Sequence, residues 1–133
     1  RFDFVVPGYS RYDRGAEALN SPWHKCGGGL LWRLEVYPRG ATSGQDEYLS
    51  VFLRCCDESS TDPFSSVANF SLYVVEQNFG RQTAVFRATK TFTNEASCWG
   101  KAKYIRLDDL MSAEQALRDD ASDSLVLGAS VTW

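Results

Sequence analysis

Apolar and polar residues alternate through most of this chain, and polar stretches separate the alternating segments. Residues 30–37 (LLWRLEVY) and 48–56 (YLSVFLRCC) both place an apolar side chain at every second position. Residues 2–6, 68–75 and 125–131 repeat the pattern. A period of two is typical of a strand with one face in a core, so each segment is predicted to be a strand.

The remaining segments complete an all-β pattern. Residues 83–93 and 103–107 are rich in residues that favour strands, and Cys98-Trp99-Gly100 leads into the second of them. Residues 22–26 predict a short strand, whereas residues 9–22 are polar and predict a loop. The only helical pattern lies near residues 108–118. We therefore predict an antiparallel β-sandwich of about eight strands with one short helical segment.

One strand carries an unusual outer face. In residues 48–56 the aliphatic side chains share one face, and Tyr48, Ser50 and Phe52 share the other. Outward faces usually prefer charged side chains, so two aromatic residues there are the first indication of a binding surface. The alternative is that the helical segment near 108–118 covers Tyr48 and Phe52.

Length and charge limit the possible partners. With 133 residues, the chain predicts a single domain over residues 1–133. A net charge of −3 gives no basic footprint for nucleic acid or for an anionic membrane. The first residues lack the order of a signal peptide, and we expect the domain to belong to a larger protein.

The four cysteines, Cys26, Cys55, Cys56 and Cys98, match no zinc-binding spacing and include no CxxC motif. Cys55 and Cys56 are neighbours in a predicted strand and should point to opposite faces. We interpret the cysteines as reduced thiols of an intracellular protein of the cytoplasm, the nucleus or both.

Catalytic patterns are missing from the sequence. His24 is the single histidine, and a Cys26 partner would lack an orienting third group. No serine lies in a GxSxG motif, and the acidic residues between 108 and 123 lack EF-hand spacing. We therefore expect a domain that is not an enzyme and that uses no cofactor or metal.

Four segments in order resemble the MATH domain, also called the TRAF-C homology domain. They are WRLEVYPRG, EYLSVFLRCCDES, CWGKAKYIRLDDL and DDASDSLVLGASV, and together they span nearly the whole chain. Within the family they are most similar to the MATH domain that precedes the protease module in the herpesvirus-associated type of ubiquitin-specific protease. The MATH-BTB adaptors of cullin ligases are a weaker match.

The resemblance implies an eight-stranded sandwich that binds short linear peptide motifs of substrate proteins in a shallow groove. A peptide docked as an extra strand gains backbone hydrogen bonds, and small pockets read its alternate side chains. Carried onto this sequence, the groove positions are Tyr48, Ser50, Phe52, Cys98, Trp99, Gly100, Lys101 and Ala102. The resemblance places Trp99 beside the face of residues 48–52, although the indole could also simply pack under a loop.

Two of these positions depart from the family. Cys98 stands where deubiquitinase domains have an aspartate, and Lys101 stands where adaptor domains have an aromatic residue. Lys90 likewise stands near the position of an adaptor tyrosine. The peptide motifs of those relatives therefore do not fit this sequence directly, and the two lysines would favour an acidic or phosphorylated ligand.

The resemblance predicts a non-catalytic module that recruits substrates to a ubiquitin-pathway protein, with a deubiquitinase as the first candidate. A cullin-adaptor substrate receptor would use the same groove. An oligomeric TRAF-type signalling adaptor is another alternative; a coiled-coil heptad run upstream would favour it, and none is visible in this sequence. A carbohydrate-binding sandwich is the alternative from another class, since aromatic side chains could stack on sugars.

Overall fold

Ten strands and one short helix make up the described part of the chain, which in this computed structural model is residues 1–9, 17–25, 29–41, 47–57, 63–76, 80–111, 118–119 and 123–132. The elements in chain order are β1 (Phe2–Val6), β2 (Leu19–Asn20), β3 (His24–Lys25), β4 (Leu30–Tyr37), β5 (Tyr48–Asp57), β6 (Ser65–Val75), β7 (Gln82–Thr93), β8 (Cys98–Arg106), α1 (Leu107–Met111), β9 (Arg118–Asp119) and β10 (Ser124–Thr132).

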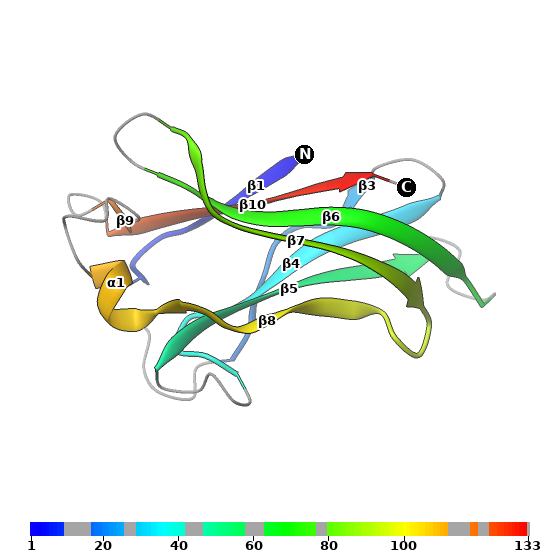
Figure 1. The fold of residues 1–133 in the computed structure, drawn as a ribbon, viewed down its shortest axis with the longest axis horizontal. Helices are drawn as coiled ribbons and strands as arrows, with labels where there is room; N and C mark the ends of the chain where they lie inside the picture. The colour runs from blue at the N-terminus through cyan, green and yellow to red at the C-terminus, as the bar shows by residue number, and fades with distance from the viewer. Residues whose placement is uncertain are drawn as a thin grey trace.

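The strands form two sheets that pack face to face (Figure 1). Sheet A has the order β1-β10-β6-β7, and β9 also pairs with β10. Sheet B has the order β2-β4-β5-β8, and β3 also pairs with β4. Every pairing is antiparallel. The predicted antiparallel β-sandwich is therefore confirmed.

Alternation along the strands builds the core. In β4 the buried side chains include Trp32, Leu34 and Val36, and in β5 they include Leu49, Val51, Leu53 and Cys55. Trp32 meets the ring of Phe92 from sheet A edge-on, with 5.0 Å between ring centroids. Phe92 in turn contacts Phe70 at 5.8 Å. These aromatic contacts join the two sheets, as offset and edge-on geometries favour.

The boundaries differ from the prediction in two places. Leu19 and Asn20, predicted as loop, form β2 against Val36 and Glu35 of β4. A two-residue strand has no periodicity that a sequence could reveal. The helix starts at Leu107 and is described as far as Met111; residues 112–117 lie outside the described ranges, and the predicted helix end at Arg118 is wrong because Arg118 pairs in β9.

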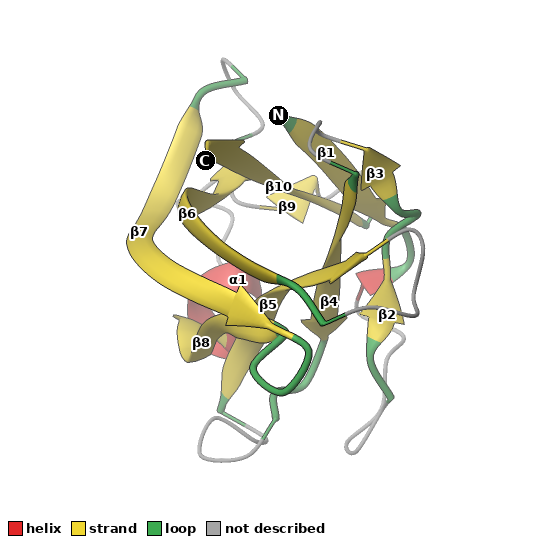
Figure 2. Cartoon of the chain, turned by 90° about the vertical axis from the view of Figure 1, so that its right-hand side faces the viewer, coloured by secondary structure: helices red, strands yellow, loops and turns green. Residues whose placement is uncertain are grey.

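β7 bends along its length (Figure 2). The β6–β7 register shifts between Leu72 and Val74, so that β7 carries one extra residue there. Ala84 lies in this irregular stretch with φ of 51°, in the left-handed region that L side chains rarely adopt. A bulge of this kind increases the local twist, and here it curves β7 along the edge of the sandwich.

Within the described residues, no helix has both the length and the apolar character needed to span a membrane.

Candidate functional site

The pairing of β5 with β8 decides which predicted site residues share a face. Phe52 lies directly across from Gly100, and Leu53 lies directly across from Trp99. Opposed residues of an antiparallel pair put their side chains on the same face. Phe52 is therefore on the outer face of sheet B, whereas Trp99 is on the side of the buried Leu53, where the two sheets meet. The expectation that residues 48–52 and the indole of Trp99 form one open shelf is therefore wrong for Phe52.

The outer face of sheet B holds a packed aromatic pair. The rings of Tyr37 and Phe52 meet edge-on at 5.9 Å, and Phe52 lies against the backbone of Gly100. A Cβ at Gly100 would stand 2.1 Å from the carbonyl oxygen of Val51 and 2.5 Å from the Cα of Phe52. Glycine at position 100 is therefore needed for the close approach of β5 and β8.

Ser50 is fully buried, and its hydroxyl already makes two hydrogen bonds within the domain. Its Oγ accepts a hydrogen bond of 2.8 Å from the backbone N–H of Ala41 and donates one to the carbonyl oxygen of Ala102. The β5–β8 register shifts at this residue, between Leu49 and Val51. The hydroxyl therefore bonds backbone groups that the irregular β5–β8 pairing leaves without a partner, and it is not available to a ligand.

Cys98 belongs to a charged cluster beside this aromatic pair. Arg54 donates to both carboxylate oxygens of the buried Glu35, and Arg33 donates to one of them. The Cys98 Sγ lies 3.9 Å from Glu35 Oε2. Burial, reinforced by the charge of Glu35, raises the pKa of the Cys98 thiol to about 11. The thiol is thus protonated at neutral pH and is a poor nucleophile.

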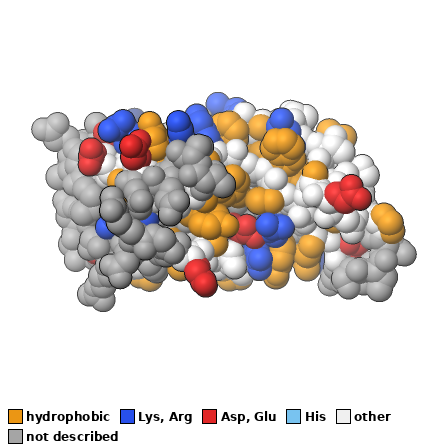
Figure 3. Space-filling view, turned by 90° about the horizontal axis from the view of Figure 1, so that it is seen from below, with side chains coloured by type: hydrophobic (Ala, Val, Ile, Leu, Met, Phe, Trp, Pro, Cys, Tyr) orange, Lys and Arg blue, Asp and Glu red, His pale blue; other side chains and the backbone are white. Residues whose placement is uncertain are grey.

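Figure 3 shows the side of the molecule that carries β8 in Figure 1, where hydrophobic side chains are interrupted by a few charged ones. Among the described residues, two tryptophans are the most exposed large aromatic side chains. Trp99 is 38% exposed and Trp23 is 37% exposed. Trp23 lies under the guanidinium of Arg33, at 4.3 Å from its ring centroid. Trp99 therefore is the large exposed aromatic side chain of β8 itself.

Trp99 lines a seam between the edge strands β7 and β8, which we call the β7–β8 seam. The ammonium of Lys90 lies 4.2 Å from the centre of the Trp99 ring, and that of Lys101 lies 5.6 Å from the centre of the Phe86 ring. Tyr104 donates a 2.7 Å hydrogen bond from its hydroxyl to the carbonyl oxygen of Ala84. The seam thus alternates aromatic rings and basic groups, and its side chains come from both sheets.

Aromatic packing against the core holds the β7–β8 seam in place. Phe86 contacts Phe70 at 6.3 Å, and Phe70 belongs to the core. Burial also raises the pKa of the Tyr104 hydroxyl, which stays protonated and able to donate to Ala84. The rings and the hydrogen bond hold the two edge strands in a fixed relation, which is the preorganisation that a recognition surface needs.

A hollow of about 410 Å³ continues the seam toward α1. Its lining includes Tyr48, Ala84, Tyr104, Arg106 and Asp109. The guanidinium of Arg106 lies 5.8 Å from the ring centre of Tyr48. Tyr48 therefore lies at the end of the seam nearest α1, and Trp99 and Lys101 lie toward the other end. Phe52 and Cys98 lie on the outer face of sheet B instead.

Both edge strands offer backbone groups. β8 ends the strand order of sheet B and β7 ends that of sheet A, so in the described residues each has a pairing partner on one side only. An unpaired strand edge presents N–H and C=O groups that can accept another strand. Sequence reasoning missed Phe86 and Tyr104 as parts of this site because it could not place β7 beside β8.

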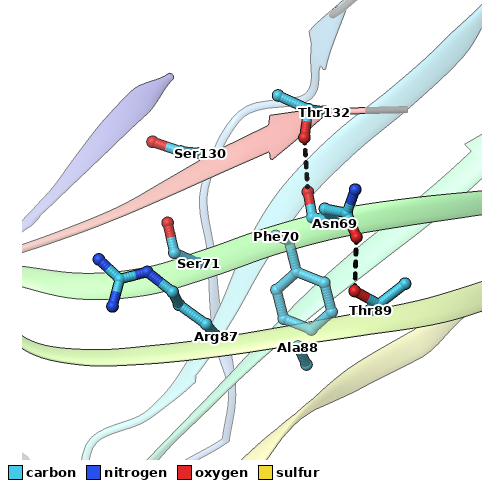
Figure 4. A pocket seen from close by; sticks show the side chains of 8 residues that line it. All are labelled: Asn69, Phe70, Ser71, Arg87, Ala88, Thr89, Ser130 and Thr132. Carbon is cyan, nitrogen blue, oxygen red and sulfur yellow. Dashed lines mark hydrogen bonds between the residues drawn. The ribbon is translucent and has the colours of Figure 1, made fainter.

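A larger hollow, of about 650 Å³, lies on the outer face of sheet A (Figure 4). Its polar groups partly satisfy one another: Thr89 donates to the side-chain oxygen of Asn69, and Thr132 donates to the Asn69 carbonyl oxygen. Arg87 is the one titratable side chain of its lining. This face offers no exposed aromatic residue in its lining and no strand edge between β10 and β7, so the β7–β8 seam is the better candidate.

Catalytic and metal-binding chemistry finds no support in the described residues. They contain no group of three His, Cys, Asp or Glu side chains that could hold a metal ion. Cys55, Cys56 and Cys98 form no disulfide bond, and the buried Cys55 and the half-buried Cys56 point to opposite faces as predicted. His24 stacks on the ring of Phe2 at 4.2 Å. Cys26, its imagined partner, lies outside the described residues.

Comparison with known protein families identifies the family of this chain. The family model for the MATH domain matches residues 1–131. The chain belongs to the MATH domain family. MATH domains are non-catalytic protein-interaction modules, and they occur in proteins of the ubiquitin pathway.

Two relatives and one solved structure show the range of proteins with this domain. Human E3 ubiquitin-protein ligase TRIM37 is 30% identical over 125 residues, which are 93% of this chain and 12% of the ligase. Ubiquitin C-terminal hydrolase 12 of Arabidopsis thaliana is 29% identical over 115 residues, which are 83% of this chain and 9% of the hydrolase. The chain thus spans about a tenth of the length of these relatives.

Among solved structures, TRAF5 of Notothenia coriiceps matches the fold with a TM-score of 0.69 and 17% identity. The match covers 98% of this MATH domain and 73% of the TRAF5 chain. This likeness confirms the sandwich architecture.

Proposed function

We propose that this MATH domain recognises extended peptide segments of substrate proteins along the edge of β8 and delivers those proteins to a ubiquitin-pathway enzyme. The observation that carries the proposal is the combination of an unpaired edge strand with a half-exposed Trp99 on that strand. Backbone pairing supplies affinity without sequence preference, and side chains at the seam then select the residues of the peptide.

The host protein is proposed to be a deubiquitinase, with an E3 ligase as the second candidate. The likeness to ubiquitin C-terminal hydrolase 12 supports the first, and the likeness to TRIM37 supports the second. The domain itself takes no part in catalysis under either proposal. The neighbouring domains of the full-length protein distinguish the deubiquitinase from the E3 ligase. A ubiquitin-specific protease module favours the first, and a ligase module favours the second.

We also propose an intracellular location, in the cytoplasm or nucleus. Cys56 and Cys98 support it, because neither forms a disulfide bond and thiols persist in reducing compartments. Fractionation of cells that express the tagged full-length protein tests this proposal. Recovery in the secreted fraction would contradict it.

The exposed tryptophans provide a matched test of the binding proposal. Arrays of ten-residue peptides are probed with the wild-type domain, with Trp99→Ala and with Trp23→Ala. Trp23 is as exposed as Trp99 but packs under the guanidinium of Arg33, which belongs to β4. We expect Trp99→Ala to lose binding to the selected peptides by at least tenfold, the usual cost of removing a central aromatic contact of about 1.4 kcal/mol or more.

We expect Trp23→Ala to keep the binding of the wild type. Thermal unfolding of both variants controls for folding. Equal binding by the wild type and Trp99→Ala would overturn the proposed site, and so would a loss confined to Trp23→Ala.

A further inference from the structure

Charge is unevenly distributed between the edge strands and the rest of the chain. β7 and β8 contain no aspartate or glutamate, although the chain has 17 acidic residues and a net charge of −3. The same two strands contain five of the 14 basic residues: Arg87, Lys90, Lys101, Lys103 and Arg106. The β7–β8 edge is therefore a basic stripe on an acidic molecule.

In the described part of the chain, four of these five side chains form no salt bridge, and one of the four, Arg87, lies on the outer face of sheet A (Figure 4). Among the described residues, no carboxylate forms a salt bridge with Lys90, Lys101 or Lys103. Arg106 differs, because it lies 4.0 Å from Asp108. Two of these ammonium groups, those of Lys90 and Lys101, therefore carry uncompensated charge beside the rings of Trp99 and Phe86.

The geometry of the seam fixes two of the ammonium groups in place. Lys90 lies over the ring of Trp99, and Lys101 lies over the ring of Phe86. A cation above an aromatic face is held electrostatically but keeps N–H donors for a second partner. Each ring and its lysine therefore form a unit that can contact the apolar stem and the acidic group of one ligand side chain.

The spacing of the β8 residues sets the spacing of the ligand. Trp99 and Lys101 are two residues apart in β8 and share the seam face. A strand docked alongside β8 would also place every second side chain on that face. We infer that the seam selects peptide segments that carry carboxylate or phosphate groups at two alternate positions. This inference rests on the proposed peptide recognition and names its ligand class.

Defined peptides separate this inference from the proposed function. Fluorescein-labelled ten-residue peptides of one Ser/Val background carry Asp at positions 4 and 6, phosphoserine at positions 4 and 6, Asp at positions 4 and 5, or Asn at positions 4 and 6. Fluorescence polarisation at 150 mM salt measures their affinities, because long-range charge effects are then largely screened beyond about 8 Å.

We expect the 4,6-Asp peptide to bind at least fivefold more tightly than the Asn peptide and the 4,5-Asp peptide. Tighter binding of the phosphoserine peptide would identify phosphate as the preferred group, and tighter binding of the Asp peptide would identify carboxylate. Equal affinities for the Asp, phosphoserine and Asn peptides would overturn the inference and leave peptide recognition intact. Absence of binding for every peptide, here and on the arrays, would instead overturn the proposed function.

Charge reversal then locates the selectivity. We expect Lys90→Glu/Lys101→Glu to lose about tenfold in affinity for the preferred acidic peptide, since each reversal replaces attraction by repulsion at the seam. We also expect it to prefer a 4,6-Lys peptide. Arg87→Glu is the matched control, because Arg87 lies on the same strand but on the outer face of sheet A (Figure 4).

Arg87→Glu should stay within twofold of the wild type. An equal loss in Arg87→Glu and in the double variant would contradict a local site at the seam. Unchanged preference for acidic peptides in the double variant would overturn the inference, and thermal unfolding shows whether each variant is folded.

Discussion

Single residues of the predicted site divide into structural and exposed ones. Ser50 satisfies Ala41 and Ala102 and is fully buried, and Gly100 admits the ring of Phe52. Trp99 and Lys101 are exposed at the seam. A family resemblance assigns both kinds of residue to the predicted site, because it identifies positions near the groove but does not show which side chains are exposed to a ligand. Only coordinates separate them.

Gly100 is predicted to be the most sensitive glycine of the edge. Gly100→Ala would place a methyl group 2.1 Å from the Val51 carbonyl oxygen, and the backbone atoms it meets cannot move aside cheaply. We expect a loss of about 2–3 kcal/mol in the free energy of unfolding, typical of overpacking. Urea denaturation measures it.

Gly80→Ala is the control for the Gly100 prediction. Its φ of 69° disfavours alanine, but nothing lies within 4 Å of the added carbon. We expect a cost of about 1 kcal/mol from the backbone alone. If Gly100→Ala costs no more than Gly80→Ala, the close packing of Phe52 on Gly100 is not supported.

The Cys98 thiol predicts a pH dependence of stability. Its pKa rises from about 9 in the unfolded chain to about 11 in the fold, so the folded state holds a proton that the unfolded state has lost. Stability is therefore complete below pH 9 and falls as the pH rises toward 11. Urea denaturation between pH 8 and 10.5 should show a steeper decline for the wild type than for Cys98→Ser. Identical slopes would contradict the burial of this thiol next to Glu35.

At the scale of the element, sequence periodicity predicts the long strands well. Residues 30–37 and 48–56 alternate because one face of each strand is buried, and the structure confirms β4 and β5 at nearly those bounds. The two-residue strands β2 and β9 form only by pairing with β4 and β10, so no local sequence pattern predicts them. The seam depends on the order of strands in two sheets, which is likewise not a local property.

The bulge of β7 yields a prediction of its own. Ala84 adopts φ of 51°, where glycine avoids the clash that alanine suffers. We expect Ala84→Gly to stabilise the domain by up to about 1 kcal/mol, with the entropy cost of glycine limiting the gain. Thermal and urea unfolding measure the change.

Ala88→Gly on the same strand is the matched control, because Ala88 does not have a positive φ. It should destabilise the domain by about 1 kcal/mol, as glycine does in an ordinary strand. A loss of stability in both variants would mean that the left-handed backbone at Ala84 is not present in solution.

At the scale of the whole molecule, the sandwich leaves two edge strands side by side and concentrates basic charge on them. β7 and β8 come from different sheets, yet Lys90 reaches Trp99 and Tyr104 reaches Ala84 across the seam. No acidic residue belongs to β7 or β8, so an acidic ligand that docks along these strands meets basic side chains on both of them. The absence of acidic residues from these strands is visible in the sequence, but its meaning depends on their adjacency.

Hydrogen exchange, followed by mass spectrometry, tests peptide recognition at the β8 edge most directly. The domain is compared alone and with the tightest peptide from the arrays. We predict slower exchange in residues 98–106 of β8, where the peptide would take up free backbone groups, with a smaller effect in β7 and none in β1 or β10. Protection confined to β1 and β10, or unchanged exchange in β8 at saturating peptide, would contradict the account.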